Sequence, residues 1–534
     1  MRGTRRFELG WKRLLACSLV MAGGTAARDA TNSVAGDDLF AEGAVWLLRL
    51  ELPEEGFQSL RADRRHYVRV TLREGTNLLR DAGVRLKGRT GSFRGLDDKP
   101  AFTVSCDEFV PGQRFRGLSK FHLNNSVEDP SYLNEKLGGE LFRAAGVPAP
   151  RVGHALVELN GRRLGLYVLK EGFAEEFLAR HFARADGALY DPGRGGDITS
   201  LPRRAGSPAL GGVTLEQLAN AAQDSDATNR WRRLSGVLDL DRFVSFMALE
   251  VLIGHRDGYC LARNNYRLYH DPMSDKFVFL PAGMDQLFGR ADLPIRPHMA
   301  GLVARGVMET PEGRRACRQR MQTLLTNVLQ VAALTNRVRD DASRLGAALP
   351  KGDARTLQRA AAEVCERIRA RLLEAGRQLT APEQEPLRFE NGIARPVSWR
   401  AVDVPVGGQL DRAAAPDGRA ALHLRAGSTT SASWRAKVLL APGRYRFEGV
   451  LRTAGVKPLP FGKNHGASLG VVGTTASRPQ LLAGETAWTK VELEFELHGR
   501  EAEVDLLCSL RASAGDAWFD AESLRLVRMK TNSD

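Results

Sequence analysis

The sequence predicts an α+β protein in which a sheet-rich region, a helical region and an all-β sandwich follow one another. Short runs of alternating apolar and polar residues occur between residues 44 and 170, separated by turns rich in Gly, Asp and Asn. From residue 310 to 379 the apolar residues instead recur at helical spacing, and Arg is abundant. Beyond residue 397 strand-like runs return at regular spacing, which is typical of a sandwich. At 534 residues the chain is also too long for a single core.

One helix is expected within the first sheet-rich region, from about Pro130 to Ala145. Asp129 suits the N-cap position, and Pro is favoured at the first helical position. Gly146 and Pro148 then end the helix. A sheet with one inserted helix is the layout that the N-terminal lobe of a kinase requires.

Glu135 falls on the face of this helix that also carries Gly138 and Gly139. Because these residues are small, another backbone can approach this face closely, so Glu135 need not be solvated. In protein kinases a helix Glu pairs with the Lys that binds the phosphates. The alternative is a solvated Glu beside Lys136.

The segment from Gly254 to Gly289, GHRDGYCLARNNYRLYHDPMSDKFVFLPAGMDQLFG, carries the polar residues that phosphoryl transfer from ATP needs. One carboxylate accepts the proton of the substrate hydroxyl, while a side-chain amide and a second carboxylate hold the metal. Asp257, Asn264 or Asn265, and Asp285 could fill these roles. The alternative is a hairpin with surface Asp and Asn, since HRD alone is a short motif.

Two upstream blocks extend this pattern: GVRLKGRTGSFRGLDDKPAFTVSCDEF (Gly83 to Phe109), and the segment from FRGLSKFHLNN to GLYVLKEGF (Phe115 to Phe173). With the later segment, they resemble the CotH kinase family. Its pattern runs V-R-L-K-G, G-L-K-x-L-x-L-N, D-x-S-x-L-x-E, N-G-x-x-x-G-x-Y-x-L-x-E, D-x(n)-N-N-Y and W-D-x-D-x-x-F-G. The resemblance covers about residues 40 to 300. It implies an atypical protein-kinase-like, two-lobed domain that uses ATP with Mg²⁺ or Mn²⁺, often on secreted or envelope proteins.

The resemblance implies roles for single residues. Asp257 would be the catalytic base, and Asn264, Asn265 and Asp285 would hold the metal. Glu135 stands at the matching place on the helix.

The phosphate-binding Lys is expected to be Lys87, with Lys99 as the second candidate. Between them, the turn from Gly88 to Gly95 could cradle phosphates with its backbone N–H groups, although a hairpin tip explains it equally well. The strand from Gly165 to Glu171 is where the two lobes should meet. By resemblance its backbone is a candidate adenine-binding hinge, which makes Glu171 an ATP-binding candidate; an edge strand is the alternative.

The chain departs from the family pattern at one place. Where the family has W-D-x-D before Phe-Gly, this chain has Ala282, Gly283, Met284 and Asp285. The aromatic residue and the first carboxylate are therefore missing. Because Mg²⁺ keeps several waters and needs only one or two protein carboxylates, Asp285 could suffice as its carboxylate ligand.

The net charge of +14 and the pI near 9.7 come from abundant Arg. Such a charge favours anionic partners, including ATP and acidic proteins, but a generally Arg-rich proteome explains it as well. The basic residues are dispersed and no nucleic-acid-binding module is present, so nucleic acid is not an expected partner.

The N-terminus has a basic stretch, an apolar run from Leu14 to about Ala22 and then small residues. This pattern is typical of a secretory signal peptide, and we expect cleavage near Ala27 and an exported mature protein. No later segment is apolar enough to form a stable membrane span. The mature chain would keep five widely spaced Cys; buried free thiols are the simplest interpretation, with a disulfide between Cys317 and Cys365 as the alternative.

The C-terminal region, residues 397–534, contains L-x-P-G-x-Y-R-F-x-G and ends in W-F-D-x-x-x-L-x-L. These motifs resemble jelly-roll carbohydrate-binding modules, which implies a possible polysaccharide partner. Such modules stack aromatic rings on sugars, and the available rings are those of Trp434, Tyr445, Trp488 and Trp518. The alternative is that these rings form a core and that the region has a structural or targeting role.

The leading hypothesis is an exported CotH-like kinase that transfers the γ-phosphate of ATP to Ser or Thr of secreted or envelope proteins. Its N-terminal lobe would span residues 40–172, its helical lobe 173–380, a linker 381–396 and the sandwich the rest. One alternative is a catalytically degenerate kinase-fold protein that binds a cell surface or glycan, which the loss at Gly283 favours. Another is a different ATP-dependent transfer, such as AMPylation or glutamylation, because a fold does not determine its chemistry.

Overall fold

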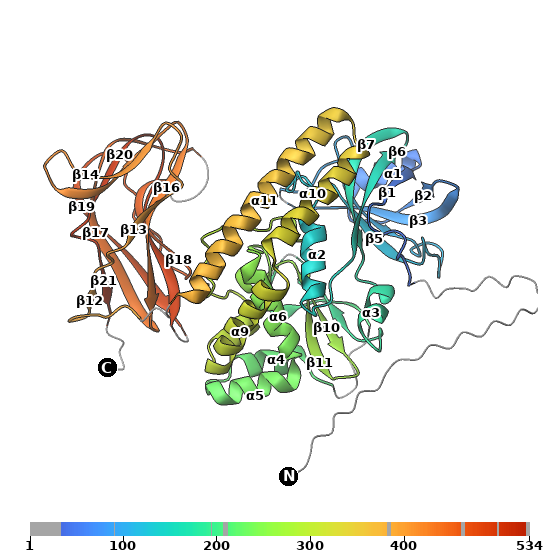
Figure 1. Cartoon of the computed structure of the whole chain (residues 1–534), viewed down its shortest axis with the longest axis horizontal. Coiled ribbons are helices and arrows are strands. Elements are labelled where there is room, and N and C mark those ends of the chain that lie inside the picture. The colour runs from blue at the N-terminus through green and yellow to red at the C-terminus, as the bar shows by residue number, and fades with distance from the viewer. Residues whose placement is uncertain are drawn as a thin grey trace, which may run out of the picture.

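The structure, a computed structural model, describes residues 34–89, 91–193, 195–206, 212–381, 386–460, 465–498 and 501–529. The predicted signal peptide, residues 1–27, lies outside the described residues. Among the described residues, the three largest apolar cores correspond to an N-terminal barrel, a helical region and a C-terminal β region. The helices α9 to α11 lie between the barrel and the C-terminal β region (Figure 1). The protein therefore has the mixed α and β content that its sequence predicts.

The N-terminal strands close into a barrel in the order β1-β2-β3-β4-β5-β7-β6. They are β1 (Val45–Glu51), β2 (Val68–Glu74), β3 (Asn77–Lys87), β4 (Ala101–Ser105), β5 (Lys120–Asn124), β6 (Val152–Leu159) and β7 (Arg162–Glu171). Parallel pairing of β1 with β6 completes the closure. Because β7 pairs with both β5 and β6, it is an interior strand, and the edge-strand alternative for residues 165–171 is wrong.

Two helices accompany the barrel, where one was predicted. Helix α1 (Glu54–Ala62) was missed, and α2 (Asn134–Ala144) begins later than the predicted Pro130. The delay has a local cause, because the Asp129 carboxylate accepts hydrogen bonds from the backbone N–H groups of Ser131 (3.1 Å) and Asn134 (2.9 Å). Asp129 therefore stabilises a turn ahead of the helix and still satisfies one of its free N–H groups.

The helical region follows β7. Its helices are α3 (Glu175–His181), α4 (Leu215–Ala222), α5 (Ala227–Val237), α6 (Leu240–Leu252), α7 (Tyr259–Ala262), α8 (Leu302–Met308), α9 (Pro311–Asn327), α10 (Val331–Ala347) and α11 (Lys351–Thr380). A four-stranded sheet in the order β11-β10-β8-β9 lies among them; its strands are β8 (Leu189–Tyr190), β9 (Arg203–Ala205), β10 (Tyr266–Asp271) and β11 (Lys276–Pro281). The helical spacing predicted for residues 310–379 is confirmed, and the structure divides this stretch into the three helices α9, α10 and α11.

The C-terminal β region comprises ten strands. They are β12 (Ile393–Ala394), β13 (Trp399–Val402), β14 (Gln409–Ala414), β15 (Ala420–Arg425), β16 (Thr430–Leu440), β17 (Gly443–Pro458), β18 (Gly466–Val472), β19 (Gly484–Leu497), β20 (Ala502–Asp520) and β21 (Arg525–Arg528). The long strands β17 and β20 pair with different partners along their lengths, and an apolar core lies within the network. Ion pairs join this region to the segment before α8, including Arg400 with Asp292 at 3.1 Å.

The five described cysteines are free and buried, as the simplest interpretation predicted. No helix in the described part of the chain is long and apolar enough to cross a membrane.

Candidate active site

Asp257 lies in the loop between α6 and α7, and it is exposed. Its Oδ2 accepts hydrogen bonds from the side-chain amides of Asn264 (2.9 Å) and Asn265 (2.7 Å). Asn265 has a left-handed backbone (φ 45°), as does Arg263 two residues earlier (φ 54°). The chain turns sharply after α7, so both amides face the same carboxylate. The structure thus brings the predicted base and the predicted amide ligands together.

The buried carboxylate of Glu250 stabilises the loop that carries Asp257. Glu250, in the last turn of α6, is fully buried and accepts hydrogen bonds from the backbone N–H groups of Tyr259 (3.1 Å) and Cys260 (2.8 Å). The His255 Nδ1 lies 3.5 Å from Glu250, and its Nε2 lies 3.1 Å from the carbonyl oxygen of Gly283. Burial alone would lower the pKa of His255, but Glu250 outweighs it and holds the pKa above its ordinary value. His255 therefore ties the Asp257 loop to the segment that carries Asp285.

Glu135 makes a buried ion pair with Lys170, and both side chains are about 5% exposed. Its other oxygen accepts a hydrogen bond from the backbone N–H of Met284 at 3.0 Å. Burial alone would raise the pKa of Glu135, but Lys170 and Lys87 lower it overall. The expectation that Glu135 lies on a face that allows close approach is confirmed. Neither of the expected lysines is its direct partner, however, because the ammonium that contacts Glu135 belongs to Lys170.

The register of β7 explains this correction. Successive side chains of a strand point to opposite faces. Leu169 packs in the barrel core, so Lys170 points outward, toward α2. The glycines on this face of α2 are closely packed: a Cβ on Gly138 would lie 2.8 Å from Met284 Sδ, and one on Gly139 would lie 2.9 Å from the carbonyl oxygen of Pro150. Helix α2 therefore lies near enough for the short Glu135 side chain to reach Lys170.

Lys87, at the end of β3, lies close enough to Lys170 and Glu135 for their charges to act on it. Its Nζ donates a hydrogen bond to Asn124 Oδ1 at 2.6 Å, and its pKa falls to about 8. Burial is the main cause, and the neighbouring charge of Lys170 adds to it. The hydrogen-bond acceptor of Lys87 is therefore neutral. An anion in its place would stabilise the buried ammonium more strongly.

Asp285 is half-buried, and its carboxyl group would be stabilised by a cation, whereas the Lys87 ammonium would be stabilised by an anion. Burial raises its pKa to about 7, and the carboxylates of Glu135 and Glu128 add to the shift. Its backbone carbonyl accepts a hydrogen bond from the Asn134 side chain at 2.8 Å, which fixes the segment against the start of α2. A carboxyl group held in this environment would gain from a bound cation.

Gly283 stands where the family pattern has its first Asp, and the structure shows which side chain lies beside this position. Gly283 has φ 57°, and a Cβ there would lie 2.5 Å from Asn265 Oδ1. The Asn265 side chain thus fills the space that a side chain at position 283 would need. Asn265 also binds Asp257, so the substitution joins the two halves of the site. We call the assembled residues the polar cluster: Lys87, Glu135, Lys170, Asp257, Asn264, Asn265 and Asp285.

Lys99 and Glu171 lie outside the polar cluster. Lys99 Nζ donates to the Tyr132 hydroxyl at 2.6 Å and lies 5.1 Å from the centroid of the Tyr167 ring. Glu171 is buried between the guanidinium groups of Arg151 and Arg180. No contact described for either residue reaches Lys170 or Asp285.

Sequence reasoning missed Lys170, Arg267 and His122. Arg267 is half-buried and lies 3.1 Å from Asp191. Burial holds the pKa of His122 well below its ordinary value, and the charges of Lys87 and Lys170 lower it further. Lys170 had a usable signal, because it precedes Glu171 in the quoted strand motif. The others had none, since their positions depend on how β5 and β10 are brought together.

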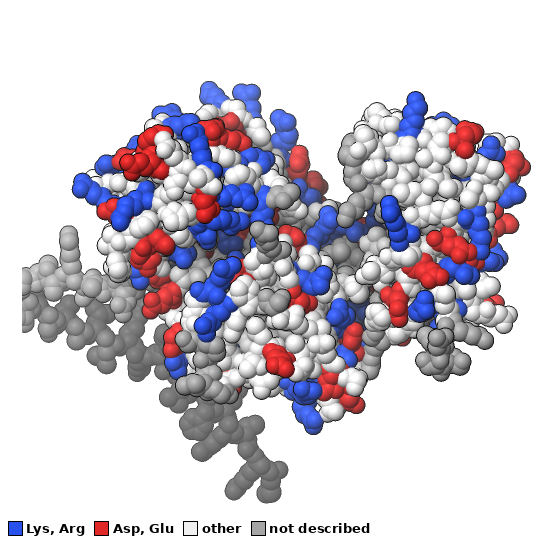
Figure 2. Space-filling view, turned by 180° about the vertical axis from the view of Figure 1, so that it is seen from behind, with Lys and Arg blue, Asp and Glu red and all other residues white. Residues whose placement is uncertain are grey.

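The described side chains include no group of three or more His, Cys, Asp or Glu that could hold a metal ion. The predicted site instead combines one carboxylate, that of Asp285, with the two asparagine amides. That set suits Mg²⁺, which prefers oxygen ligands and keeps several waters. Basic side chains are spread over both halves of the face shown in Figure 2, with acidic side chains between them.

A family model described as CotH kinase protein matches residues 84–369, more than half of the chain. The chain belongs to the CotH kinase protein family. Invasin CotH2 of Rhizopus delemar is 24% identical over 253 residues, which cover 41% of this chain and 42% of that protein. Inner spore coat protein H of Bacillus subtilis is 25% identical over 197 residues, which cover 34% of this chain and 53% of that protein. The chain thus spans about half the length of the curated relatives it matches.

Two solved structures show weaker likenesses. The Helicobacter pylori proinflammatory kinase CtkA has a TM-score of 0.27 at 8% identity, covering 55% of this chain and 98% of that one. TmCBM61, solved in complex with β-1,4-galactotriose, has a TM-score of 0.18 at 19% identity, covering 26% of this chain and 94% of that one. At TM-scores this low, neither likeness determines the fold of this protein.

Proposed function

We propose that this CotH family member is an ATP-dependent phosphotransferase. It would transfer the γ-phosphate to a Ser or Thr hydroxyl of secreted or envelope proteins. The barrel with α2 would form the N-terminal lobe of a kinase-like domain, and the helical region would form the other lobe. The observation that carries the proposal is the buried Lys170–Glu135 pair, which Met284 joins to the segment of Asp285.

Each residue of the polar cluster has a role that follows from its contacts. Lys170, oriented by Glu135, would bind the phosphates, as the paired Lys of kinases does. Lys87 would supply a second cation, because its ammonium lies in a half-buried place without an anionic hydrogen-bond partner. These two charges would hold a phosphate group in a fixed orientation, which is how most of the rate gain in phosphoryl transfer arises.

Asp257 would accept the proton of the substrate hydroxyl. The two asparagine amides bind its Oδ2, and the described residues donate no hydrogen bond to its Oδ1. Its exposure gives a protein substrate access to that free oxygen. The amides therefore orient the Asp257 carboxylate and leave its Oδ1 free to accept the proton.

The donor set fits a divalent metal, because the Asp285 carboxyl has a raised pKa and lacks a cationic contact in the described structure. Asp285, with Asn264 and Asn265, would hold the ion. Mg²⁺ or Mn²⁺ would supply charge neutralisation for the phosphates.

Intact mass of the mature protein, and of candidate substrate proteins mixed with it, tests the proposal after incubation with ATP and Mg²⁺ or Mn²⁺. A phosphate-sized gain that disappears in Asp257→Ala supports the kinase function. An AMP-sized gain would instead support AMP transfer. The exported state is tested separately, by N-terminal sequencing of the protein recovered from its producing cells.

A second candidate function is binding without catalysis, which the Gly283 position favours. There Asn265 occupies the space of a carboxylate that the family pattern has. In that case ATP with metal would cause neither a mass gain nor a rise in melting temperature. The C-terminal β region would then provide the function, on a cell surface or a polysaccharide.

A further inference from the structure

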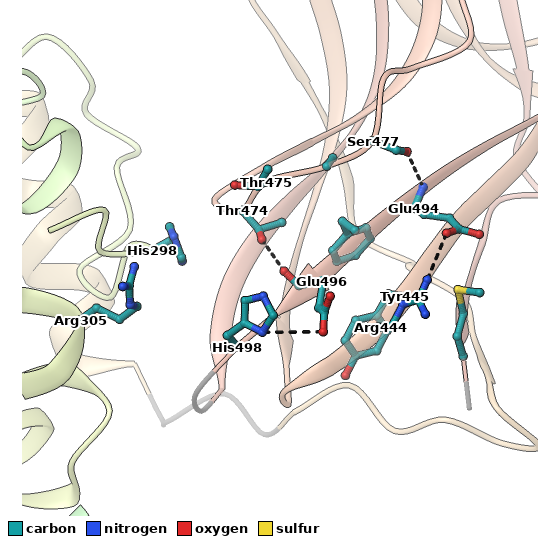
Figure 3. Close-up of a pocket in the computed structure, with 13 residues that line it drawn as sticks. His298, Arg305, Arg444, Tyr445, Thr474, Thr475, Ser477, Glu494, Glu496 and His498 are labelled. Atoms are coloured by element: carbon teal, nitrogen blue, oxygen red, sulfur yellow. Dashed lines mark hydrogen bonds and ion pairs between the residues drawn. The ribbon is translucent and has the colours of Figure 1, made fainter. Parts of the chain in front are cut away.

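A cavity of about 670 Å³ lies between the helical region and the C-terminal β region (Figure 3). His298 and Arg305 line one side, and residues of β17, β19 and the segment before β19 line the other. Its volume is within the range of ligand-binding sites, about 300–1,000 Å³. The cavity is separate from the polar cluster, with which it shares no residue.

The helical side of the cavity presents positive charge without a partner. Arg305, on α8, is half-buried, and its guanidinium makes no ion pair or hydrogen bond with any described residue. Burial lowers the pKa of His298 beside it, and the charges of Arg305 and His498 lower it further. Arg305 would therefore gain from an anion in the cavity, such as a carboxylate bound by both guanidinium nitrogens.

The opposite side presents hydroxyls and carboxylates. The Ser477 hydroxyl oxygen accepts a hydrogen bond from the Glu494 backbone N–H at 3.1 Å, which leaves its own hydrogen free to donate. Arg444 lies 3.7 Å from the Glu494 carboxylate, and His498 lies 3.7 Å from that of Glu496. Both ion pairs are long and both carboxylates are about half exposed, so these carboxylates can accept hydrogen bonds from the hydroxyls of a ligand.

Among the described residues that line the cavity, no Phe, Tyr or Trp presents an exposed ring face for stacking. Tyr445 and Phe495 lie at its wall, but both are buried in the core. Elsewhere Trp434 and Trp518 are also buried, and Trp488 is half-buried with the Arg419 guanidinium over its ring at 5.1 Å. Recognition of a neutral sugar by ring stacking is therefore not available to these residues.

We propose that this cavity binds an acidic saccharide, in which a uronate carboxylate pairs with Arg305. The sugar hydroxyls would bind Ser477 and the carboxylates of Glu494 and Glu496. Ion pairs hold the two sides of the cavity together, with Arg400 3.1 Å from Asp292 and Arg290 3.9 Å from Asp505. The site therefore exists only where the two regions meet.

Isothermal titration of the full mature chain tests this site, using trigalacturonate and neutral galactotriose as matched ligands and inorganic phosphate as a simple anion. We expect trigalacturonate to bind at least about tenfold more tightly than galactotriose, and Arg305→Ala to remove about the same factor. Arg305→Lys should keep part of the affinity, because it keeps the charge. Arg315→Ala, which removes an exposed guanidinium on α9, is the matched control and should bind as the unmodified protein does.

Three results would overturn the proposal: equal affinity for the neutral and acidic trimers, no binding of either, or unchanged affinity in Arg305→Ala. Phosphate binding as tight as that of trigalacturonate would show a general anion site and would also overturn it. Melting temperatures of the variants show whether a loss of affinity comes from unfolding.

A different observation carries a second inference, which rests on the proposed function. Lys136, next to Glu135 on α2, points away from the polar cluster, and its Nζ lies 2.8 Å from both carboxylate oxygens of Asp341 on α10. Both residues are buried. Close by, Arg337 of α10 lies 2.8 Å from Glu140 of α2. Adjacent residues of α2 thus make buried ion pairs in opposite directions, one with the barrel and one with α10.

We infer that Lys136 and Asp341 are positioning residues that hold α2 where Glu135 reaches Lys170. Hydrogen exchange across residues 134–144 and the ATP-induced shift in melting temperature test this. Lys136→Met should speed exchange in α2 and remove most of the ATP shift, because it breaks the buried pair between α2 and Asp341. Asp341 then keeps only the cations of its own helix, Arg344 at 3.0 Å and Arg337 at 3.5 Å. Lys136→Met/Asp341→Leu replaces both charges with apolar groups and should restore most of both.

The two proposals fail in different ways. If the unmodified protein shows no ATP shift and no mass gain, the proposed function fails. If it shows both, and Lys136→Met retains the full ATP shift while α2 exchanges faster, the pair is merely structural and the positioning role is wrong.

Discussion

The polar cluster and the cavity beside the C-terminal β region both contain acids and bases, but they hold them differently. Glu135 and Lys170 are about 5% exposed and in direct contact, whereas Arg444 and Glu494 are about half exposed and 3.7 Å apart. A buried pair has a fixed geometry and a large cost of disruption, while an exposed pair contributes little to stability. The first arrangement suits chemistry that needs fixed atoms, and the second suits a ligand that must displace existing contacts.

The largest expected effect is on catalysis. Asp257→Ala should reduce transfer by about 10²–10⁴-fold, the usual contribution of a general base. Because Asp257 is exposed, the melting temperature should stay nearly unchanged. Rates from mass spectrometry and a thermal melt of the same sample check both parts. Unchanged turnover in this variant would remove Asp257 as the base.

The buried ion pair should show the next largest effect, on stability. Glu135→Ala leaves Lys170 buried without its carboxylate, which should lower the free energy of unfolding by about 3–5 kcal/mol. Denaturant unfolding measures this change. Glu496→Ala in the cavity is the comparison, and a loss as large there would contradict the difference between the two regions.

A substitution at Gly283 tests whether Asn265 leaves room for a carboxylate at this position. Gly283→Asp should destabilise the protein by about 1–3 kcal/mol, because it strains a left-handed backbone and collides with Asn265. Adding Asn265→Gly should recover part of this loss by vacating the space. Equal stability of Gly283→Asp with and without Asn265→Gly, measured by thermal melts, would show that Asn265 is not the obstacle.

Lys87 predicts a pH dependence with a definite sign. Its folded pKa of about 8 lies below the unfolded value of about 10.4, so the folded state disfavours the charged form. Lys87 therefore lowers stability below pH 8, and this penalty disappears as the pH rises to about 10. Lys87→Met should be more stable than the unmodified protein at pH 7, by a margin that shrinks between pH 8 and 10. A margin that grows over this range in thermal melts would mean that the pKa of Lys87 is not lowered.

The smallest effect is expected at the cavity rim. Arg444→Ala removes a half-exposed, 3.7 Å ion pair and should change the free energy of unfolding by less than about 0.5 kcal/mol. Chemical denaturation can resolve this against Glu135→Ala. A larger loss would show that the Arg444–Glu494 pair stabilises the C-terminal β region more than an exposed ion pair usually does.

Local sequence patterns predicted much of the fold because they depend on near neighbours. The helical spacing from residue 310 to 379 predicted the helices α9 to α11, and the glycines beside Glu135 predicted a close-packed face. The start of α2 was misplaced because Asp129 binds two backbone N–H groups in a turn that propensity alone does not reveal. Helix α1 was missed because it is only nine residues long and has Pro53, with no side-chain hydrogen bond, at its N-cap.

The sequence by itself determined the inventory of this protein: the motif residues Asp257, Asn264, Asn265 and Asp285, the helix that carries Glu135, and the three successive regions. Only the tertiary structure decided which lysine meets Glu135, and that Asn265 fills the space at Gly283. It alone also placed Arg305 opposite the C-terminal strands. The physical reason is that strand alternation and helix periodicity act over a few residues. Closure of the barrel and packing of distant elements, by contrast, set which side chains share a buried space.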